Sequence, residues 1–532
     1  MRRILEPGRN CWQRSEAHDA GVIIDARDYY RAFYQAARRA KRYIAITGWQ
    51  FDSDVALLRG GDAEAAQSEV RMLPLLRELC QRNPELHVYI LAWDFSLLFA
   101  MEREWMQELL FNWHSERISF RFDASAPLYG AHHQKLVLID GQVAFTGGMD
   151  ICDCRWDDRD HPACSDLRCD TGRDPHGPYH DVQAVVTGPV VQTLAELFEA
   201  RWFNSGGGEL ALPVPVSRDD VEVMATLPLP PGPVAVSRTF GKTLVPFQEQ
   251  VQEVRALYLD AIDAAERLIY MENQYFSSRA IFQALVRRMR APERSKLDIV
   301  FVLPRMPEAL KEQIAVGVAQ VRMLDTLRRI ARETGHSLGV YCSSPCSEDG
   351  KDVFTYIHSK VMLVDDRFLT VGSANTTNRS LGLDSELNLA WEALDEEPGS
   401  GELRRTLRRL RVSLLAEHAG LEALSHLRML ARADGLVAFL DGVAEAGKHR
   451  LRLHPLETVF DQSPLLKPLE PEAFSIDPED SVLDEGLFES LKQEDGFLAP
   501  SLRLLTRFIL RRPHRAHPAS LPAPVAEVAS EG

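Results

Sequence analysis

The sequence predicts an α/β protein in which two halves repeat the same order of elements. Three observations support this prediction. Segments with helical and with strand-like patterns alternate along the chain, as they do in layered α/β domains. One polar motif occurs twice, in copies that begin 225 residues apart. A stretch rich in glycine and proline lies between the two copies and has the composition of a linker.

The elements follow from hydrophobic periodicity. Apolar residues three or four positions apart indicate helices, and short apolar runs indicate strands. In the first half the pattern predicts helices at 29–42, 73–80 and 190–202, and strands at 43–49, 87–93 and before the Gly188-Pro189 turn. In the second half it predicts helices at 248–267, 280–290 and 306–334, strands at 268–276 and 298–303, and a helix-rich region at 403–448.

Composition changes along the chain predict the domain boundaries. Residues 1–210 form the first half and residues 236–450 the second, each with one copy of the motif. Residues 211–235, which are rich in proline and follow a run of glycines, form the linker. Residues 451–532 are a C-terminal extension, and we expect it to be partly disordered because it is rich in proline and charge.

The overall composition is that of a globular protein without a membrane span. Apolar residues make up 45% of the chain and charged residues 26%. The longest apolar runs are strand-length, and the basic N-terminus lacks the apolar core of a signal peptide, so we expect a cytoplasmic protein. A net charge of −16 argues against a nucleic-acid partner. The oligomeric state is left open.

A group of cysteines raises the question of a metal. Cys152, Cys154, Cys164 and Cys169 lie close together in the sequence, with His161 among them. Their spacing lacks the paired C-x2-C of common zinc sites, and the segment has the polar character of a surface insertion. We therefore expect reduced loop cysteines and no metal, with a structural zinc ion as the alternative.

The repeated motif holds five polar or glycine positions in register. Relative to the histidine, lysine follows at 2 residues, aspartate at 7, glycine at 14 and aspartate or asparagine at 17, in both copies. A single His-x-Lys pair is common, but five matched positions indicate that one half restates the other. The members are His133, Lys135, Asp140, Gly147 and Asp150 in the first copy, and His358, Lys360, Asp365, Gly372 and Asn375 in the second.

Each copy predicts a β-hairpin. The histidine and lysine are two residues apart in a run that continues with apolar residues, so their side chains should share one face of a strand. Asp140-Gly141 and Asp365-Asp366 mark the turns, and an apolar run returns after each of them. Asp140 and Asp365 therefore lie far from the histidines along the strand. We interpret both as structural residues that bond the backbone of the hairpin.

Two histidines and two lysines that converge would suit phosphoryl transfer. One neutral imidazole can attack phosphorus while the other, protonated, gives a proton to the leaving alcohol, which leaves a phosphohistidine. Lys135 and Lys360 would hold the nonbridging oxygens. Each imidazole also needs an acid to fix its tautomer. Glu386 lies 28 residues after His358, and Asp181 occupies the equivalent place in the first half.

Both motif copies resemble the H-x-K-x4-D-x6-G-(G/S)-x-(N/D) pattern of the phospholipase D superfamily. Further stretches are similar to its eukaryotic-type members, and the likeness covers most of residues 20 to 420. The stretches are Arg155-Trp156-Asp157, His180-Asp181-Val182, Arg201-Trp202, Glu272-Asn273-Gln274-Tyr275-Phe276 and Asn378-Arg379-Ser380.

The resemblance implies a fold and roles for the motif residues. The halves would be two pseudo-symmetric α/β/α/β/α sandwich domains with the active site at their interface. His133 would be the nucleophile and His358 the general acid and base, although the sequence itself is symmetric on this point. Asp150, Ser373 and Asn375 would bind the substrate phosphate, and no cofactor would be needed.

The resemblance also implies a substrate class. The expected enzyme hydrolyses a glycerophospholipid such as phosphatidylcholine to phosphatidic acid, or transfers the phosphatidyl group to an alcohol. It would then contact membranes peripherally. A phosphatidyltransferase similar to cardiolipin synthases, or a nuclease, is the alternative with the same chemistry. A scaffold without turnover is disfavoured because both histidines and both lysines are present.

Overall fold

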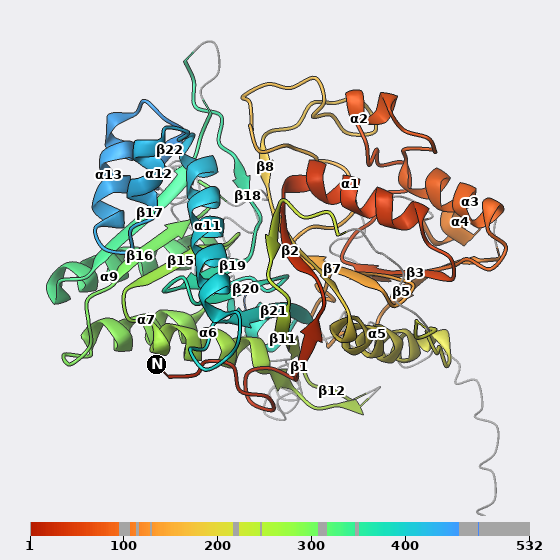
Figure 1. The fold of residues 1–532 in the computed structure, drawn as a ribbon, viewed down its shortest axis with the longest axis horizontal. Coiled ribbons are helices and arrows are strands. Elements are labelled where there is room, and N and C mark those ends of the chain that lie inside the picture. The colour runs from red at the N-terminus through yellow and green to blue at the C-terminus, as the bar shows by residue number, and fades with distance from the viewer. Residues whose placement is uncertain are drawn as a thin grey trace, which may run out of the picture. The chain divides into compact units, whose positions relative to one another are not determined.

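The computed structural model describes residues 2–94, 107–112, 116–127, 130–215, 223–244, 247–306, 316–345, 350–456 and 477. These residues belong to one compact unit that spans Met1–Ser481. Two large mixed sheets with helices packed against them make up this unit, as the sequence predicts for an α/β protein (Figure 1). Most of the predicted C-terminal extension lies outside the described residues.

The first sheet has eight strands in the order β10-β2-β9-β7-β6-β3-β4-β5. Its strands β3 and β4 are parallel, and so are β4 and β5, while the others pair antiparallel. In chain order, the helices and strands as far as residue 202 are β1 (Gln13–Ala17), β2 (Ala20–Ile24), α1 (Asp25–Arg38), β3 (Tyr43–Gly48), α2 (Gly61–Glu64), α3 (Met72–Arg82), β4 (His87–Trp93), α4 (Gln107–Asn112), β5 (Ile118–Asp123), β6 (Leu136–Ile139), β7 (Val143–Gly147), β8 (Tyr179–His180), β9 (Val182–Thr187) and α5 (Pro189–Trp202).

The second sheet runs in the order β1-β11-β21-β20-β19-β15-β16-β17-β22, with β14 beside β11. Seven of its strands, from β11 to β17, follow the order and relative directions of β2 to β5 in the first sheet. The elements are β10 (Leu227–Leu229), β11 (Gly232–Phe240), β12 (Thr243–Leu244), β13 (Phe247–Gln248), β14 (Val251–Gln252), α6 (Glu253–Ala264), β15 (Leu268–Glu272), α7 (Arg279–Arg290), β16 (Asp298–Val302), α9 (Val318–Thr334), β17 (Ser337–Ser343), β18 (Tyr356–Ile357), β19 (Val361–Val364), β20 (Phe368–Gly372), α10 (Asn378–Gly382), β21 (Glu386–Glu392), α11 (Ser400–Ala419), α12 (Leu424–Leu430), α13 (Leu436–Ala446) and β22 (Leu451–Leu453).

Three large hydrophobic cores of the described residues fill the space between these elements. One joins the two sheets and includes apolar side chains of α5, α11 and α13. The second lies between the first sheet and the helices α1 and α3. The third lies between the second sheet and the helices α6, α7 and α9 (Figure 1). The sheets therefore pack against a shared interior, and helices cover their outer faces.

Two strands connect across the expected boundary between the halves. Strand β1 pairs with β11 of the second sheet, and β10 pairs with β2 of the first. Strands β10 and the start of β11 lie in the proline-rich range where the sequence indicates a linker. Their prolines fall at positions where composition suggests a loop, but β10 is an edge strand, where a missing N–H is tolerated.

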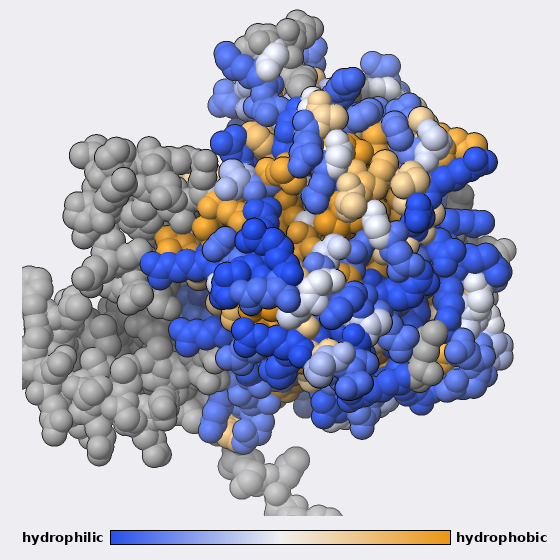
Figure 2. All heavy atoms as spheres, turned by 90° about the vertical axis from the view of Figure 1, so that its left-hand side faces the viewer, coloured by the Kyte–Doolittle hydropathy of each residue, from blue (hydrophilic) through white to orange (hydrophobic). Residues whose placement is uncertain are grey.

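Most predicted elements are present with shifted ends. The helix expected at 248–267 begins at Glu253, because Phe247 to Gln252 form the short strands β13 and β14. The helix expected at 306–334 is described from Val318. Among the described helices, none is long and apolar enough to cross a membrane. The face seen from the side of α9 and α13 mixes hydrophobic with hydrophilic residues (Figure 2).

The two motif hairpins have the same turn. Asp140 and Gly141 have φ angles of 53° and 68°, and Asp365 and Asp366 have φ angles of 53° and 52°. Positive φ at both central residues is the mark of a type I′ turn, whose twist matches that of the strands. The carboxylate of Asp140 accepts hydrogen bonds from the backbone N–H groups of residues 41, 42 and 43.

Asp365 makes the same three bonds to the backbone of residues 266, 267 and 268. Both aspartates therefore bond the chain that enters strand β3 or β15, and not their own hairpin as the sequence suggested. Replacing Asp140 with alanine should lower the free energy of unfolding by about 2–3 kcal/mol, because three N–H groups lose a charged acceptor. Denaturant unfolding measures this loss. Asp140→Asn, which tolerates the positive φ, should lose less, and an unchanged Asp140→Ala would contradict the role.

Candidate active site

The two motif histidines lie where the halves meet, just before strands β6 and β19. Those strands begin at Leu136 and Val361, so the histidines and lysines lie just before the strands. The sequence predicts instead that they lie within a strand and share one of its faces. The difference arises because each histidine pairs with a segment from the other half. The N–H of His133 donates to the carbonyl of Ser385, and that of His358 donates to the carbonyl of His180.

These backbone bonds bring each histidine beside an acid of the opposite half. His133 Nδ1 lies 3.0 Å from Glu386 Oε2, and His358 Nδ1 lies 2.6 Å from Asp181 Oδ2. The short parallel pair of β8 with β18 aligns Asp181 with His358. Both acids that the sequence selects are therefore at the histidines. The pairing crosses between halves, which sequence spacing does not reveal.

The site is buried, yet both imidazoles reach solvent. The His133 and His358 side chains are 16% and 11% exposed, whereas both carboxylates are fully buried. Burial lowers the pKa of each histidine well below its usual range, and the nearby lysines lower it further. The charge of His133 is itself close enough to lower the pKa of His358. Without an anion in the site, both imidazoles are therefore neutral near pH 7.

Burial also raises the pKa values of the two acids, to different extents. The pKa of Asp181 rises to about 6, with Lys360 opposing the rise. The pKa of Glu386 rises to about 8, because Asp384 adds to the effect of burial. At neutral pH the first acid is mainly ionised and the second is mainly protonated. The two histidines thus have unequal partners, although the sequence around them is symmetric.

The motif lysines are held by backbone carbonyls and one polar partner each. Lys135 Nζ donates to the His133 carbonyl and lies 3.1 Å from Asp150 Oδ2. Lys360 Nζ donates to the His358 carbonyl and, at 3.1 Å, to Gln274 Oε1. Burial lowers the pKa of Lys360 to about 7, although Asp181 counteracts it. Lys360 can therefore lose its charge within the physiological range.

The three residues expected to bind phosphate have partners in the protein. Asp150 accepts from the N–H of Trp49 and pairs with Lys135. The Ser373 hydroxyl donates to Glu386 at 2.5 Å. Asn375 Nδ2 lies 3.3 Å from Gln274 Oε1. Asp150 thus holds Lys135 in place, and Ser373 holds Glu386. The carboxylate of Asp150 would repel a substrate phosphate.

Several residues at the site carried no role in the sequence analysis. Gln274 accepts from Lys360 and donates to the hydroxyls of Tyr275 and Tyr356. The rings of Tyr179 and Tyr356 lie 5.5 and 6.3 Å from the His358 ring. The stretch that contains Gln274 resembles the superfamily in sequence. Because it lies far from the second motif along the chain, the sequence did not predict its contact with Lys360.

The cysteines of the insertion do not surround His161. His161 Nδ1 lies 2.8 Å from Asp157 Oδ2 and its Nε2 lies 3.2 Å from Glu417 Oε1, both fully buried contacts. Cys164 is exposed and Cys152 is buried, and none of the four cysteines of the insertion forms a disulfide. Among the described residues, the groups that could hold a metal contain histidine and carboxylate and no cysteine. The alternative of a cysteine-bound zinc ion therefore has no support.

Comparison with known proteins matches both halves to one superfamily. Residues 114–226 match the family described as phospholipase D, and residues 258–405 match that described as cardiolipin synthase, phospholipase D-like domain. The first match contains His133 and the second His358. The crystal structure of phosphatidylserine synthase from Haemophilus influenzae Rd KW20 aligns with 80% of this chain and 93% of that chain, at 14% identity and a TM-score of 0.44.

Two relatives carry the phospholipase D name. Phospholipase D A of Dictyostelium discoideum is 26% identical over 440 residues, which are 70% of this chain and 33% of the relative. Phospholipase D alpha 1 of Cynara cardunculus is 22% identical over 541 residues, which are 75% of this chain and 65% of the relative. The chain thus spans about a third and just under two thirds of their lengths. With both histidine motifs inside matched regions, the chain belongs to the phospholipase D superfamily.

Proposed function

We propose that this protein is a phosphodiesterase of the phospholipase D type. It hydrolyses a glycerophospholipid such as phosphatidylcholine to phosphatidic acid and the free head group, or passes the phosphatidyl group to an alcohol. The two halves act as pseudo-symmetric domains with the active site at their interface. The observation that carries this proposal is the pair of histidines, each bonded through Nδ1 to an acid of the other half, at 3.0 and 2.6 Å.

The first step forms a phosphohistidine. Because the Nδ1 atoms face the acids, the Nε2 atoms are the reactive nitrogens. His133 Nε2 attacks phosphorus, and the bond from phosphorus to the head-group oxygen breaks as His358 Nε2–H gives that oxygen its proton. Lys135 and Lys360 balance the charge on the nonbridging oxygens as the transition state forms.

The second step reverses the roles around phosphorus. Water or an alcohol enters where the head group left, and His358, now neutral, takes its proton. The new oxygen bonds to phosphorus and the bond to His133 breaks, which releases phosphatidic acid or a new phosphatidyl ester. The same two residues therefore serve hydrolysis and transfer, and the supply of water or alcohol decides between them.

The unequal acids support the assignment of the two roles. A general acid must carry a proton, and an ionised Asp181 at 2.6 Å favours the charged form of His358 once the substrate phosphate offsets the lysines. Glu386, whose pKa is raised to about 8, favours a charged His133 less. His133 is then the better candidate for the neutral nucleophile.

The pH dependence should report Lys360. Its pKa of about 7 lies below the ordinary value, so the lysine loses its positive charge as pH rises through neutrality. We expect kcat/KM to fall up to about tenfold per pH unit on the alkaline side, since this parameter reports the free enzyme. In Lys360→Arg the residue stays charged, so we expect a weaker enzyme whose kcat/KM falls less steeply between about pH 7 and pH 9 than that of the wild type. Equal slopes in the wild type and in Lys360→Arg over that range would contradict the assignment.

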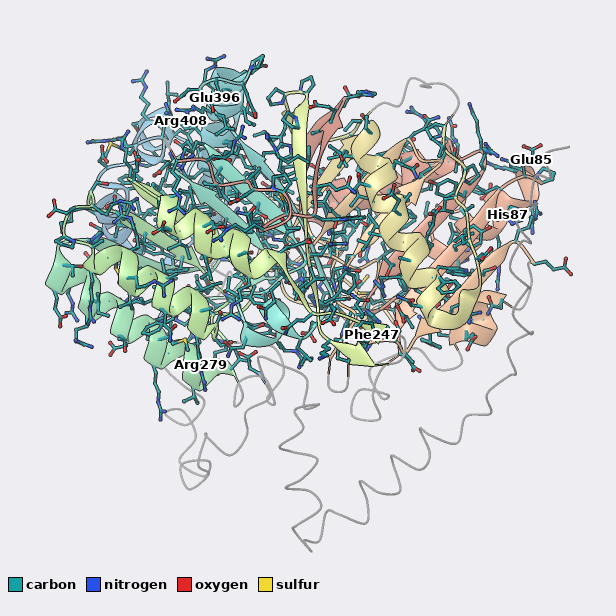
Figure 3. All side chains as sticks on the ribbon, turned by 90° about the horizontal axis from the view of Figure 1, so that it is seen from below. Glu85, His87, Phe247, Arg279, Glu396 and Arg408 are labelled. Carbon is teal, nitrogen blue, oxygen red and sulfur yellow. The ribbon has the colours of Figure 1, made fainter. Side chains whose placement is uncertain are left out.

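Contact with a lipid surface would involve the hairpin of β12 and β13. Phe247 is 66% exposed and points outward on this hairpin (Figure 3). Residues Thr243 and Gln248 of the hairpin line a small cavity together with His132 and Ser385, next to the histidine His133. Phe247→Ser should lower activity on vesicles several-fold and leave activity on a short-chain soluble diester unchanged. Equal loss on both substrates would indicate a structural role instead.

Phosphatidylbutanol formation tests the proposed function. Purified protein is incubated with vesicles of phosphatidylcholine and phosphatidylethanolamine and added butanol, beside His133→Ala and His358→Ala. Phosphatidylbutanol that is absent from both variants supports the proposal. If the intact protein makes neither phosphatidylbutanol nor phosphatidic acid, the lipid substrate is wrong. Phosphatidylglycerol as acceptor and single-stranded DNA then test the cardiolipin synthase-like and nuclease alternatives.

A further inference from the structure

A second cluster of buried ionisable groups lies behind the active site. Asp25, His161, His180 and Glu417 each direct one ligand atom into a common space, where these atoms all lie within 4.8 Å of one another. The four side chains are at most 1% exposed. Asp25, His161 and His180 come from the first half, and Glu417 comes from helix α11 of the second. The mechanism proposed above uses none of them.

The four atoms have the spacing of a tetrahedral metal site. His180 Nδ1 lies 3.0 Å from Asp25 Oδ1 and 2.8 Å from Glu417 Oε1. His161 Nε2 lies 3.5 Å from Asp25 Oδ2 and 3.2 Å from Glu417 Oε1. Ligands about 2.0–2.1 Å from a tetrahedral zinc ion stand roughly 3.3 Å apart. The four measured distances, which involve both carboxylate oxygens of Asp25, bracket that value.

Both imidazoles are already oriented as metal ligands are. The second nitrogen of His180, Nε2, lies 3.0 Å from Glu272 Oε2. The second nitrogen of His161, Nδ1, lies 2.8 Å from Asp157 Oδ2. A carboxylate on the outer nitrogen fixes the proton there and turns the lone pair of the inner nitrogen to the metal, which is the usual arrangement around histidine ligands.

Two of the inner atoms lack a hydrogen bond. Among the described residues, His180 Nδ1 and Asp25 Oδ2 make no hydrogen bond of acceptable geometry, although both are buried. With the protons on the outer nitrogens, lone pairs of nitrogen face lone pairs of oxygen at about 3 Å, which is repulsive unless positive charge lies between them. Asp25 also has a φ of 65°, an uncommon conformation for a residue other than glycine, and it directs the carboxylate into the cluster.

The charges around the cluster call for about two further positive charges. Asp25, Glu417, Asp157 and Glu272 are four buried carboxylates. Arg159 pairs with Glu417 and Arg168 pairs with Asp157, which leaves two negative charges. One divalent cation would balance them, and so would two additional protons shared among His161, His180 and His418, the last of which is bonded to Glu272. The badly directed Nδ1 of His180 favours the cation, since a metal ion accepts all four lone pairs at once.

We propose that Asp25, His161, His180 and Glu417 bind one divalent metal ion, zinc by the chemistry of its ligands, which joins the two halves behind the active site. Imidazole nitrogens and carboxylate oxygens both bind zinc, and a closed set of four protein ligands is the arrangement of a structural zinc site. The backbone N–H of Asp25 donates to the carbonyl of Asp181, the acid beside His358, and the N–H of Asp181 donates to Asp25 Oδ1. The ion would therefore hold that acid in place without touching the substrate.

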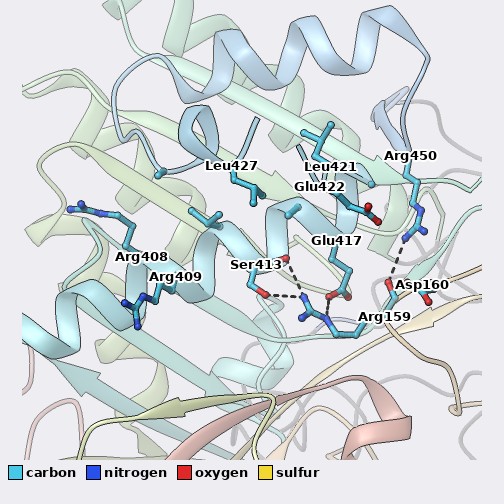
Figure 4. A pocket seen from close by; sticks show the side chains of 14 residues that line it. Arg159, Asp160, Arg408, Arg409, Ser413, Glu417, Leu421, Glu422, Leu427 and Arg450 are labelled. Carbon is cyan, nitrogen blue, oxygen red and sulfur yellow. Dashed lines mark hydrogen bonds and ion pairs between the residues drawn. The ribbon is translucent and has the colours of Figure 1, made fainter. Parts of the chain in front are cut away.

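A cavity borders the cluster at Glu417. It has a volume of about 700 Å³ and lies along α11, away from the two motif histidines. Arg159 and Glu417 line it, and Figure 4 shows Arg159 bonded to Glu417 and Ser413 at its wall. Glu417 thus presents one oxygen to the cavity side and the other to the cluster.

Metal content of the whole chain tests the proposal. Protein made with an affinity tag free of histidine is exposed to excess ZnCl₂, dialysed, and measured by mass spectrometry of the elements. We expect about one zinc per chain, and less than about a tenth in His161→Gln with Glu417→Gln. The matched control, Cys154→Ser with Cys164→Ser and Cys169→Ser, should retain its zinc.

A second measurement uses the wild-type chain and so does not depend on the folding of variants. Zinc added to chelator-treated protein should raise Tm by about 5 °C or more. Cobalt(II) in its place should give visible bands of a tetrahedral site without the strong near-ultraviolet band of thiolate ligands. Less than about a tenth of an equivalent of zinc with an unchanged Tm, or zinc lost in the cysteine control, would overturn the proposal. Neither measurement depends on lipid turnover, so the proposal of a metal site is tested separately from the proposed function.

Discussion

His358→Ala is expected to release about one equivalent of p-nitrophenolate from phosphatidic acid esterified to p-nitrophenol and then to stop, whereas His133→Ala releases none. The leaving group departs as a stable anion, so the first step no longer needs an acid. The second step still needs a base to deprotonate water. Without His358 the enzyme would therefore remain as the phosphohistidine. Without His133 the phosphohistidine would never form.

The burst is measured by stopped-flow absorbance, and the trapped phosphatidyl group by the mass of the peptide that contains His133. On an ordinary phosphatidylcholine substrate both variants should lose at least about 10³-fold in kcat, since the head group then needs a proton. A burst from His133→Ala and none from His358→Ala would exchange the two roles. Wild-type turnover with no trapped group in either variant would remove the phosphohistidine from the mechanism.

The parts of this site that depend on local sequence could be predicted. The turn residues and the apolar runs around Asp140 and Asp365 define both hairpins, because turn chemistry and strand pattern act over a few residues. The helix-strand alternation gives the α/β class for the same reason. The histidines and lysines stand out because the motif occurs twice, which a single copy would not have shown.

Contacts between the halves could not be predicted in the same way. The sequence selects Glu386 and Asp181 without indicating which histidine each acid serves, and the backbone bonds at Ser385 and His180 place each acid beside the histidine of the other half. Strand β1 likewise pairs in the second sheet, and β10 in the first. These pairings depend on how two folded halves meet, and one sequence contains no record of that.

The cysteine insertion shows that residues close together in sequence need not contact one another in the fold. Its cysteines and His161 lie close in sequence, so a zinc site made of them was the natural alternative. In the fold, His161 turns inward to carboxylates that lie up to 256 residues away, and Cys164 remains at the surface. Proximity along a loop is a weak guide to ligation, because a loop can direct neighbouring side chains to opposite sides.

Asp181→Asn and Glu386→Ala should affect different steps, and this is the sharpest test of the crossed pairing. On the p-nitrophenyl ester, Asp181→Asn should keep the burst and slow the steady state by about 10³-fold or more, because His358 loses the acid that fixes its tautomer. Glu386→Ala should slow the burst itself, because His133 Nδ1 loses its acceptor. Each variant would then behave as a milder form of the alanine variant of the histidine to which its acid is bonded in the structure.

If each acid served the histidine of its own half, the two phenotypes would be exchanged, so the experiment decides between the pairings. Asp365→Asn is the matched control. It removes a carboxylate from a motif, yet its side chain bonds only backbone N–H groups on the way into β15, so both phases should persist in folded protein. Loss of both phases in that control would show that unfolding, and not the tautomer of an imidazole, explains the effects. Intact circular dichroism in all three variants, with the burst retained in only one of the acid variants, would establish which acid serves which histidine.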